Sequence, residues 1–206
     1  MVRELRERGG IRDERVLAAL ERVPRHRFVP EPLIDRAYGR HALPIPGGQT
    51  ITQPWVVARM SELLEVEADH TVLEIGTGSG YQAAILAHLA RRVYTLERIG
   101  NLAHAAIRRM RDLNIHNVKV QAFDGSLGWG EIAPIERILV TAGAPEAPPP
   151  LLEQLAPAGI LVLPEGDRDR QLLVRYRRQG AEDWEREEYE PVTFVPLIGR
   201  HGWPGP

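Results

Sequence analysis

Cysteine is absent from the 206 residues, and lysine is nearly absent. Without cysteine the chain can form no disulfide, no thiolate metal site and no cysteine nucleophile. Lys119 is the single lysine among 26 basic residues, which stand against 28 acidic ones and leave a formal net charge of −2. A chain so balanced lacks the broad positive field of general nucleic-acid binders, so we expect no nucleic-acid partner.

Long apolar runs are missing as well. No stretch approaches the roughly 18 apolar residues of a membrane span, and the charged start MVRELRERGG has no signal-peptide core. Hydrophobic residues make up 43% of the chain and charged residues 26%, which is ordinary for a globular protein. The length suits one α/β domain with short additions. We therefore expect a soluble, monomeric, cytoplasmic enzyme with no membrane partner.

The first 66 residues are expected to form an extension with two helices. Asp13 can cap a helix that ends at Pro24, and a second helix is predicted over 53–65, with Thr52 or Gln53 at its cap and Pro54 in its first turn. Residues 24–50 are rich in proline and glycine, so we expect little regular structure there.

Strands and helices then alternate through a core over residues 67–166. Short apolar runs at 71–75, 92–96, 117–121, 136–142 and 159–164 alternate with helical patterns, which predicts a mainly parallel sheet with helices on both faces. The alternation stops at residue 166. Residues 167–206 are expected to be antiparallel strands: a pair at 171–178 and 183–190, and a last strand at 191–197. The fold class is therefore α/β and Rossmann-like.

A glycine-rich turn follows the first core strand. It runs from Gly76 to Gly80 and leads into a helix, an arrangement that lets the backbone approach a ligand closely. A dinucleotide fingerprint would want glycine at position 81, where the chain has Tyr81. Glu74, two residues before the first glycine, suits a ligand with a positive end better than a pyrophosphate.

Two more carboxylates stand at strand ends. Glu97 ends the second strand, where a carboxylate can accept hydrogen bonds from ribose hydroxyls, and Asp124-Gly125 follows the third, placed to meet an adenine edge. A ligand that combines adenine, ribose and a positively charged end is S-adenosylmethionine, and we expect it as the cofactor. The seven histidines are scattered without partners at ligand spacing, so no metal is expected.

Several stretches together resemble the protein-L-isoaspartate (D-aspartate) O-methyltransferase family. They are AYGRHALPIPGGQTITQPWVVARMSELL, VLEIGTGSGYQAAILA, ILVTAGAPEAPPPLLEQLAPAGILVLP and FVPLIG, in order along the chain. The resemblance implies a class I methyltransferase that moves a methyl group from S-adenosylmethionine to the free α-carboxylate of L-isoaspartyl residues in damaged proteins, and to D-aspartyl residues less well. The products would be a methyl ester and S-adenosylhomocysteine.

The resemblance also implies roles for particular residues. Thr52 matches the hydroxyl residue of the active site, and the matches for peptide binding are Thr52, Gln53, Val195, Pro196 and Leu197. The matches for cofactor binding are Glu74, Gly76, Thr77, Gly78, Ser79, Gly80, Glu97, Arg98, Asp124, Gly125 and Thr141. Arg40 and Pro46 depart from the pattern, standing where the resemblance implies an acidic residue and a glycine.

The chemistry so implied needs no general base. An α-carboxyl has a pKa of about 3.3–3.7 and is already ionised at pH 7. We expect the neutral hydroxyl of Thr52 and nearby N–H groups to orient it, because a strongly charged clamp on the attacking oxygen would stabilise the ground state more than the transition state. The alternative interpretation makes Thr52 only the cap of the 53–65 helix.

Two other functions remain open from the residues alone. The chain could be another S-adenosylmethionine enzyme, acting on RNA or on a small molecule, that shares only the cofactor half. It could also be a non-catalytic nucleotide-binding module or an NAD-linked reductase, although Tyr81 and Glu74 argue against the reductase.

Overall fold

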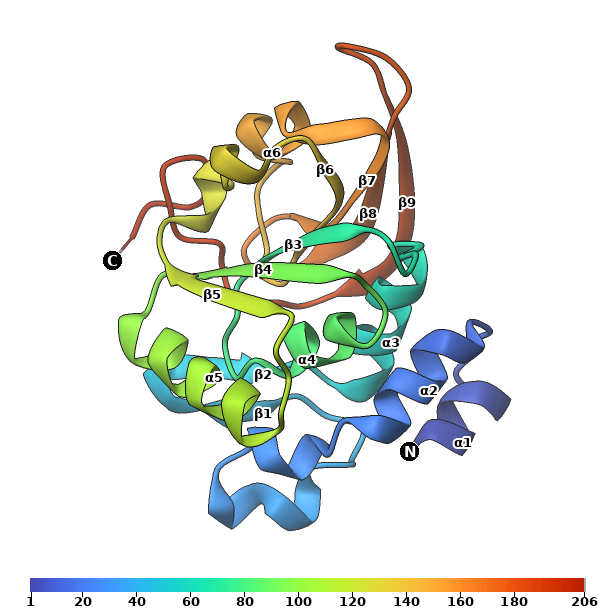
Figure 1. The fold of residues 1–206 in the computed structure, drawn as a ribbon, viewed down its shortest axis with the longest axis vertical. Helices are drawn as coiled ribbons and strands as arrows, with labels where there is room; N and C mark the ends of the chain where they lie inside the picture. Colours follow the sequence, from blue (N-terminus) through green and yellow to red (C-terminus); the bar gives the residue numbers. More distant parts are fainter. Residues whose placement is uncertain (206) are drawn as a thin grey trace.

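A seven-stranded sheet runs through the molecule in the order β5-β4-β3-β6-β7-β8-β9 (Figure 1). The computed structural model describes residues 1–205. β3 to β7 are parallel, and β8 and β9 are added antiparallel at one edge. The strands are β3 (Thr71–Ile75), β4 (Arg92–Glu97), β5 (Val118–Ala122), β6 (Ile135–Val140), β7 (Leu155–Gly166), β8 (Gln171–Arg178) and β9 (Trp184–Val192). The α/β class and the mainly parallel sheet are confirmed.

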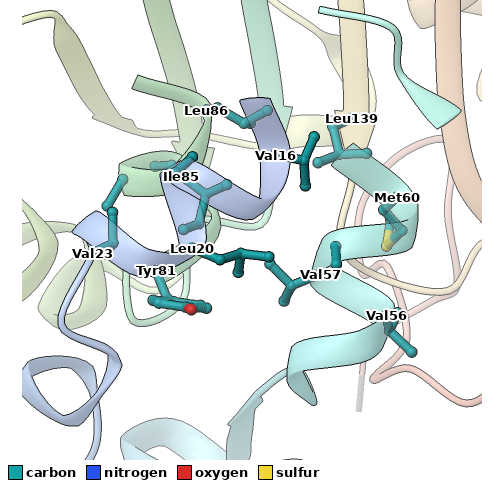
Figure 2. Close-up of a cluster of buried hydrophobic side chains, with 14 of the residues drawn as sticks. Val16, Leu20, Val23, Val56, Val57, Met60, Tyr81, Ile85, Leu86 and Leu139 are labelled. Carbon is teal, nitrogen blue, oxygen red and sulfur yellow. The ribbon is translucent and has the colours of Figure 1, made fainter. Parts of the chain in front are cut away.

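The two faces of the sheet are covered unequally. Helices α2 (Glu14–Arg22), α3 (Pro54–Leu63), α4 (Tyr81–Ala87) and α5 (Gly100–Asp112) lie on one side in Figure 1, and the short α6 (Pro149–Glu153) lies on the other. Side chains alternate along β3 accordingly: Val72 joins the core under the helices, whereas Leu73 and Ile75 join the core on the α6 side. Figure 2 shows the helix side, where Leu20 of α2 and Val57 of α3 lie near Ile85 of α4.

The N-terminal extension is more ordered than its composition predicts. α1 (Val2–Glu7) precedes α2, and the Asp13 carboxylate caps α2 by accepting hydrogen bonds from the N–H groups of Arg15 and Val16 at 2.8 and 3.4 Å. Two 3₁₀ segments, Arg25–Phe28 and Glu31–Arg36, follow. The sequence missed a small antiparallel hairpin, β1 (Leu43–Ile45) with β2 (Gln49–Ile51), because its strands are too short to show a period.

The predicted last strand at 191–197 is wrong. β9 continues to Val192, and the chain beyond it makes isolated bridges, between Pro196 and Gly143 and between Ile198 and Trp203, but no further strand within residues 193–205. The N–H of Gly143 donates to Val195 O and the N–H of Leu197 donates to Gly143 O, both at 2.8 Å. Pro196 has no N–H to offer a ladder. The segment therefore runs past the carboxyl end of β6 instead of joining the sheet.

Candidate active site

The glycine loop joins β3 to α4 at the carboxyl ends of the parallel strands. The N–H groups of Gly76 and Thr77 both donate to Leu96 O of β4, at 2.8 and 3.2 Å. Gly76 has a φ of 99°, and a Cβ built there would lie 2.6 Å from Oγ1 of Thr141. That hydroxyl in turn lies 2.9 and 2.7 Å from the carbonyl oxygens of Ile75 and Gly76. The loop is thus held between β4 and β6, with no room for a side chain at its start.

Glu97 is fixed by the same loop. Its Oε2 accepts the N–H of Gly78 at 2.8 Å, and its Oε1 accepts the N–H of Ile99 at 2.8 Å. The residue is 7% exposed and lines the cleft described below. Each oxygen of an ionised carboxylate has two acceptor positions, so each keeps one after these bonds. Glu97 can accept two further hydrogen bonds from a ligand's hydroxyl groups without moving.

Glu74 lies beneath the loop and not in the cleft. The side chain is 0% exposed, and Oε2 accepts a hydrogen bond from Thr95 Oγ1, which lies 2.6 Å from Thr77 Oγ1. Its Oε1 has no hydrogen-bond partner among residues 1–205. Burial raises the pKa of Glu74 to about 8, against the hydrogen bond from Thr95. Glu74 is therefore mostly protonated at neutral pH and cannot present a negative charge to a ligand.

Asp124 holds the C-terminal segment to the end of β5. Its carboxylate accepts the Ser126 hydroxyl at 2.7 Å, the Ser126 N–H at 3.0 Å and the Arg200 N–H at 2.9 Å. Burial alone would raise the pKa of Asp124, but these hydrogen bonds outweigh it and lower the pKa. Asp124 is not in the lining of the cleft, whereas Gly125 beside it is. A Cβ at Gly125 would collide with Ile75 Cγ2.

These strand ends surround one cleft of about 920 Å³, counting its open mouth. Three parts of the chain line it: the β2–α3 segment, the strand-end loops of the core, and the C-terminal segment. It brings together twelve of the residues predicted from the sequence: Thr52, Gly76, Thr77, Gly78, Ser79, Glu97, Arg98, Gly125, Thr141, Val195, Pro196 and Leu197. Glu74, Gly80 and Asp124 lie behind it.

Thr52 and Gln53 face different hollows. Gln53 is the N-cap of α3 and makes no side-chain cap bond, so Thr52 precedes the cap and the interpretation of Thr52 as a helix cap is wrong. Thr52 lines the cleft, and its hydroxyl makes no hydrogen bond to any other of residues 1–205. Gln53 lies instead in a second hollow, with Trp55 and the end of α1.

Sequence reasoning missed part of the lining. The missed residues that also line the cleft include Gln49, Thr50, Ile51, Tyr81, Gln82, Ile99 and Ile198. Tyr81 follows the glycine loop directly, so its position was visible in the sequence, but it served there only as an argument against a dinucleotide. Gln49–Ile51 form β2, the short strand that the sequence did not show.

Residues 1–205 contain neither a membrane-spanning helix nor a cluster of metal-binding side chains. None of the helices within residues 1–205 is long and apolar enough to cross a membrane. Over the same residues, no three histidine, cysteine, aspartate or glutamate side chains gather in a group that could hold a metal ion.

Two relatives that are similar to this chain over nearly its whole length carry the same name. A chain named protein-L-isoaspartate O-methyltransferase from Magnetococcus marinus is 52% identical over 194 residues, which is 94% of this chain and 85% of that relative. One of the same name from Serratia proteamaculans is 52% identical over 198 residues, or 96% of this chain and 94% of that relative. Both alignments span the extension, the core and the C-terminal segment.

Solved structures are similar in fold. A protein-L-isoaspartate O-methyltransferase superposes with a TM-score of 0.86 at 26% identity, covering 98% of this chain and 67% of that one. A chain from Plasmodium falciparum, described as a putative enzyme of the same kind in complex with S-adenosyl-L-homocysteine, superposes with a TM-score of 0.82 at 24% identity, covering 96% of each chain. A family model described as Protein-L-isoaspartate(D-aspartate) O-methyltransferase matches residues 1–202, and the chain belongs to that family.

Proposed function

We propose that this chain transfers a methyl group from S-adenosylmethionine to the free α-carboxylate of L-isoaspartyl residues in damaged proteins, and more weakly to D-aspartyl residues. The products are a methyl ester and S-adenosylhomocysteine. The observation that carries the proposal is a single cleft lined by both halves of the family pattern, with Glu97 and the glycine loop on one side and Thr52 on the other.

The cofactor half of the cleft fits an adenosine. Glu97 is held by two main-chain N–H groups and keeps free acceptor positions for two ribose hydroxyls. Gly125 and Ile75 both line the cleft, and a Cβ at Gly125 would collide with Ile75, so a residue without a side chain stands where we place the base. When bound, S-adenosylmethionine supplies a methyl group on a positively charged sulfonium. Arg98 at the mouth and Ser79 in the loop complete the lining we assign to it.

Glu74 and Asp124 serve the cofactor half indirectly. Glu74 links through Thr95 to the loop residue Thr77, and Asp124 fixes the turn that contains Gly125. Gly80 ends the loop at the start of α4, and Thr141 holds the loop from the side of β6. We assign these residues to cofactor binding through the shape they give the loop and not through direct contact.

The substrate half orients an anion that needs no activation. The α-carboxylate is ionised at neutral pH, so these residues have only to align it and exclude water. Thr52 donates to it from a hydroxyl that has no other partner within residues 1–205. Val195 to Leu197 hold the peptide from the opposite wall, and Gln53 contacts its flank at the second hollow. Alignment of this kind contributes about 7–11 kcal/mol in favourable cases.

We also infer that residues 1–206 act as one catalytic domain and as a monomer. The extension (1–66), the core (67–166) and the remaining C-terminal part (167–206), which contains β8, β9 and the C-terminal segment, each supply lining to the same cleft. No second chain is therefore needed to complete the cleft. The formal net charge of −2 supports protein substrates over nucleic acids, and we infer that these substrates are damaged proteins in the cytoplasm. Size-exclusion chromatography tests the monomer.

The experiment that tests the function uses a matched pair of peptides. The chain is incubated with S-adenosylmethionine labelled on its methyl group and with a peptide that contains one isoaspartyl residue, or its aspartyl twin. We expect base-labile label on the isoaspartyl peptide alone. Equal labelling of both peptides, or labelling only of RNA or of a small molecule, would overturn the proposal.

A further inference from the structure

A buried arginine lies directly behind the wall of the cleft. Arg25 is 0% exposed and is among the largest fully buried side chains of the molecule. Its Nε donates to Ala37 O and its Nη2 donates to Thr52 O, both at 2.7 Å. Its guanidinium carbon lies 4.7 Å from the centre of the Tyr81 ring. Arg25 therefore connects the N-terminal extension to two residues that line the cleft, Thr52 and Tyr81.

No negative side chain neutralises this cation. Among residues 1–205, Arg25 has no carboxylate within ion-pair distance, and its Nη1 has no hydrogen-bond partner. Burial lowers the pKa of Arg25, but a guanidinium stays protonated in proteins. A buried charge without a counter-ion is costly, and a hydrophobic side chain of the same size would avoid that cost. Packing alone would therefore not require a positively charged side chain at position 25.

The contacts of Arg25 place its positive charge next to Thr52, the residue that we assign to the negative carboxylate of the substrate. Thr52 supplies the hydroxyl that we assign to the substrate carboxylate, and Arg25 holds the carbonyl of the same residue. A charge a few ångströms behind a low-dielectric wall acts on an anion without touching it. Because it does not bond to the attacking oxygen, it attracts the carboxylate without a strong clamp on the reacting atom.

Resting on the proposed function, we propose that Arg25 is a positioning residue for the substrate carboxylate. It fixes the main chain of Thr52 and places an unneutralised positive charge beside that residue, behind the wall of the cleft, so that the cleft selects an anionic group over a neutral one of the same shape. The two roles predict two separate signatures: the charge sets the preference for a carboxylate in binding, and the geometry sets kcat.

The test for the charge compares two peptides that differ at one group. One contains an isoaspartyl residue, and the other carries the α-carboxyl of that residue as a carboxamide. Their dissociation constants are measured by calorimetry on the full chain with S-adenosylhomocysteine present. In Arg25→Met we expect the preference for the carboxylate peptide to fall about tenfold, as removal of one nearby charge through a partly shielded path predicts.

Arg25→Lys tests the geometry. Lysine keeps the charge, but its single ammonium cannot reproduce the fork that joins the carbonyls of Ala37 and Thr52. We expect this variant to keep the carboxylate preference within about threefold and to lose about tenfold in kcat, with binding of S-adenosylhomocysteine unchanged.

Arg137→Met is the matched control. Arg137 lies near the start of β6, far along the strand from the cleft, and it also donates to main-chain carbonyls, at 3.0 Å to Glu65 O and 2.8 Å to Glu136 O. We expect this variant to lose stability with no change in carboxylate preference.

Two results would overturn the inference. If Arg25→Met weakens both peptides equally, the arginine has only a structural role. If Arg25→Met yields no folded protein, Arg25→Lys alone decides, and wild-type kcat in that variant contradicts the positioning role. Neither result touches the proposed function, which fails only if the wild-type chain does not methylate the isoaspartyl peptide.

Discussion

The two walls of the cleft are built in different ways. The cofactor wall is made of main-chain groups at the ends of regular strands, where the N–H groups of Gly76 and Gly78 are tied to Leu96 O and to Glu97. The substrate wall comes from the short strand β2, Thr52 between β2 and α3, and an irregular C-terminal segment. Long-range contacts such as Arg25 with Thr52 and Asp124 with Arg200 bring these parts together. The first wall is defined by local geometry and the second by tertiary contacts.

Because the two walls depend on different contacts, mutations should affect them separately. Changes on the cofactor wall should weaken binding of S-adenosylhomocysteine, whereas changes on the substrate wall should alter kcat or the KM for peptide and leave that binding intact. A residue that alters both equally would break the comparison.

The largest effect is expected at Glu97. Glu97→Ala removes the acceptor proposed for both ribose hydroxyls and the brace on Gly78, so the dissociation constant for S-adenosylhomocysteine should rise at least about 100-fold. Calorimetry measures it. Glu182→Ala, an exposed carboxylate outside the strands, is the control and should leave the constant unchanged. A rise of less than tenfold in this dissociation constant would contradict the role of Glu97 in cofactor binding.

Thr52 tests the other wall. Thr52→Val keeps the shape of the side chain and removes the hydroxyl, so kcat should fall about thirtyfold, as expected for the loss of one hydrogen bond to a charged group. Binding of S-adenosylhomocysteine should stay within about twofold. Thr52→Ser keeps the hydroxyl and should retain most of the activity. An unchanged kcat in the valine variant excludes Thr52 from the mechanism.

The raised pKa of Glu74 should make the free energy of unfolding depend on pH. Its pKa is raised to about 8 in the folded chain from an ordinary value of 4.5, so between these values the folded chain binds more protons than the unfolded chain. The contribution of this group is therefore fully present below about pH 4.5 and is lost as pH rises toward 8.

Glu74→Gln removes that titration. The free energy of unfolding of wild type relative to Glu74→Gln should fall by about 1 kcal/mol per pH unit between pH 5 and 8. Urea unfolding of both chains across that range measures it. Parallel pH profiles would mean that Glu74 stays ionised in the folded chain and would contradict the raised pKa.

The smallest effect is expected at Gly199. A Cβ there would collide with Oδ1 of Asp124, whose other oxygen, Oδ2, accepts the N–H of Arg200 and so holds the C-terminal segment. Gly199→Ala should raise the KM for peptide about threefold by loosening that segment, with binding of S-adenosylhomocysteine nearly unchanged. Gly205→Ala, where the new Cβ meets only ordinary contacts, is the control. Steady-state kinetics compare the two variants.

The same division explains what could be predicted from the sequence. The strand, glycine turn and helix around Gly76–Gly80 follow from local patterns, and β3 and β4 lie where the apolar runs placed them. Glu97 ends β4 and lines the cleft, as a carboxylate at a strand end should. These features depend on neighbours in sequence, which a pattern records.

Long-range features escaped the pattern. Glu74 was placed at a ligand because it precedes the glycines, but the strand alternation turns it into the core under the helices, beside Thr95. Arg25 gave no sign of its burial, because its partners Ala37 and Thr52 are 12 and 27 residues away. The segment at 191–197 looked like a strand by composition, but Pro191 and Pro196 leave it few donors for a ladder.

The most direct test follows an isoaspartyl peptide during incubation with the chain and S-adenosylmethionine, by liquid chromatography, which separates it from the isomeric aspartyl peptide, coupled to mass spectrometry. We expect the peptide to gain one methyl group and then to lose methanol, giving a succinimide. Hydrolysis of the succinimide should return part of it as the normal aspartyl peptide. The aspartyl twin should stay unchanged throughout. An isoaspartyl peptide that remains unmethylated while the chain binds S-adenosylhomocysteine would contradict the account.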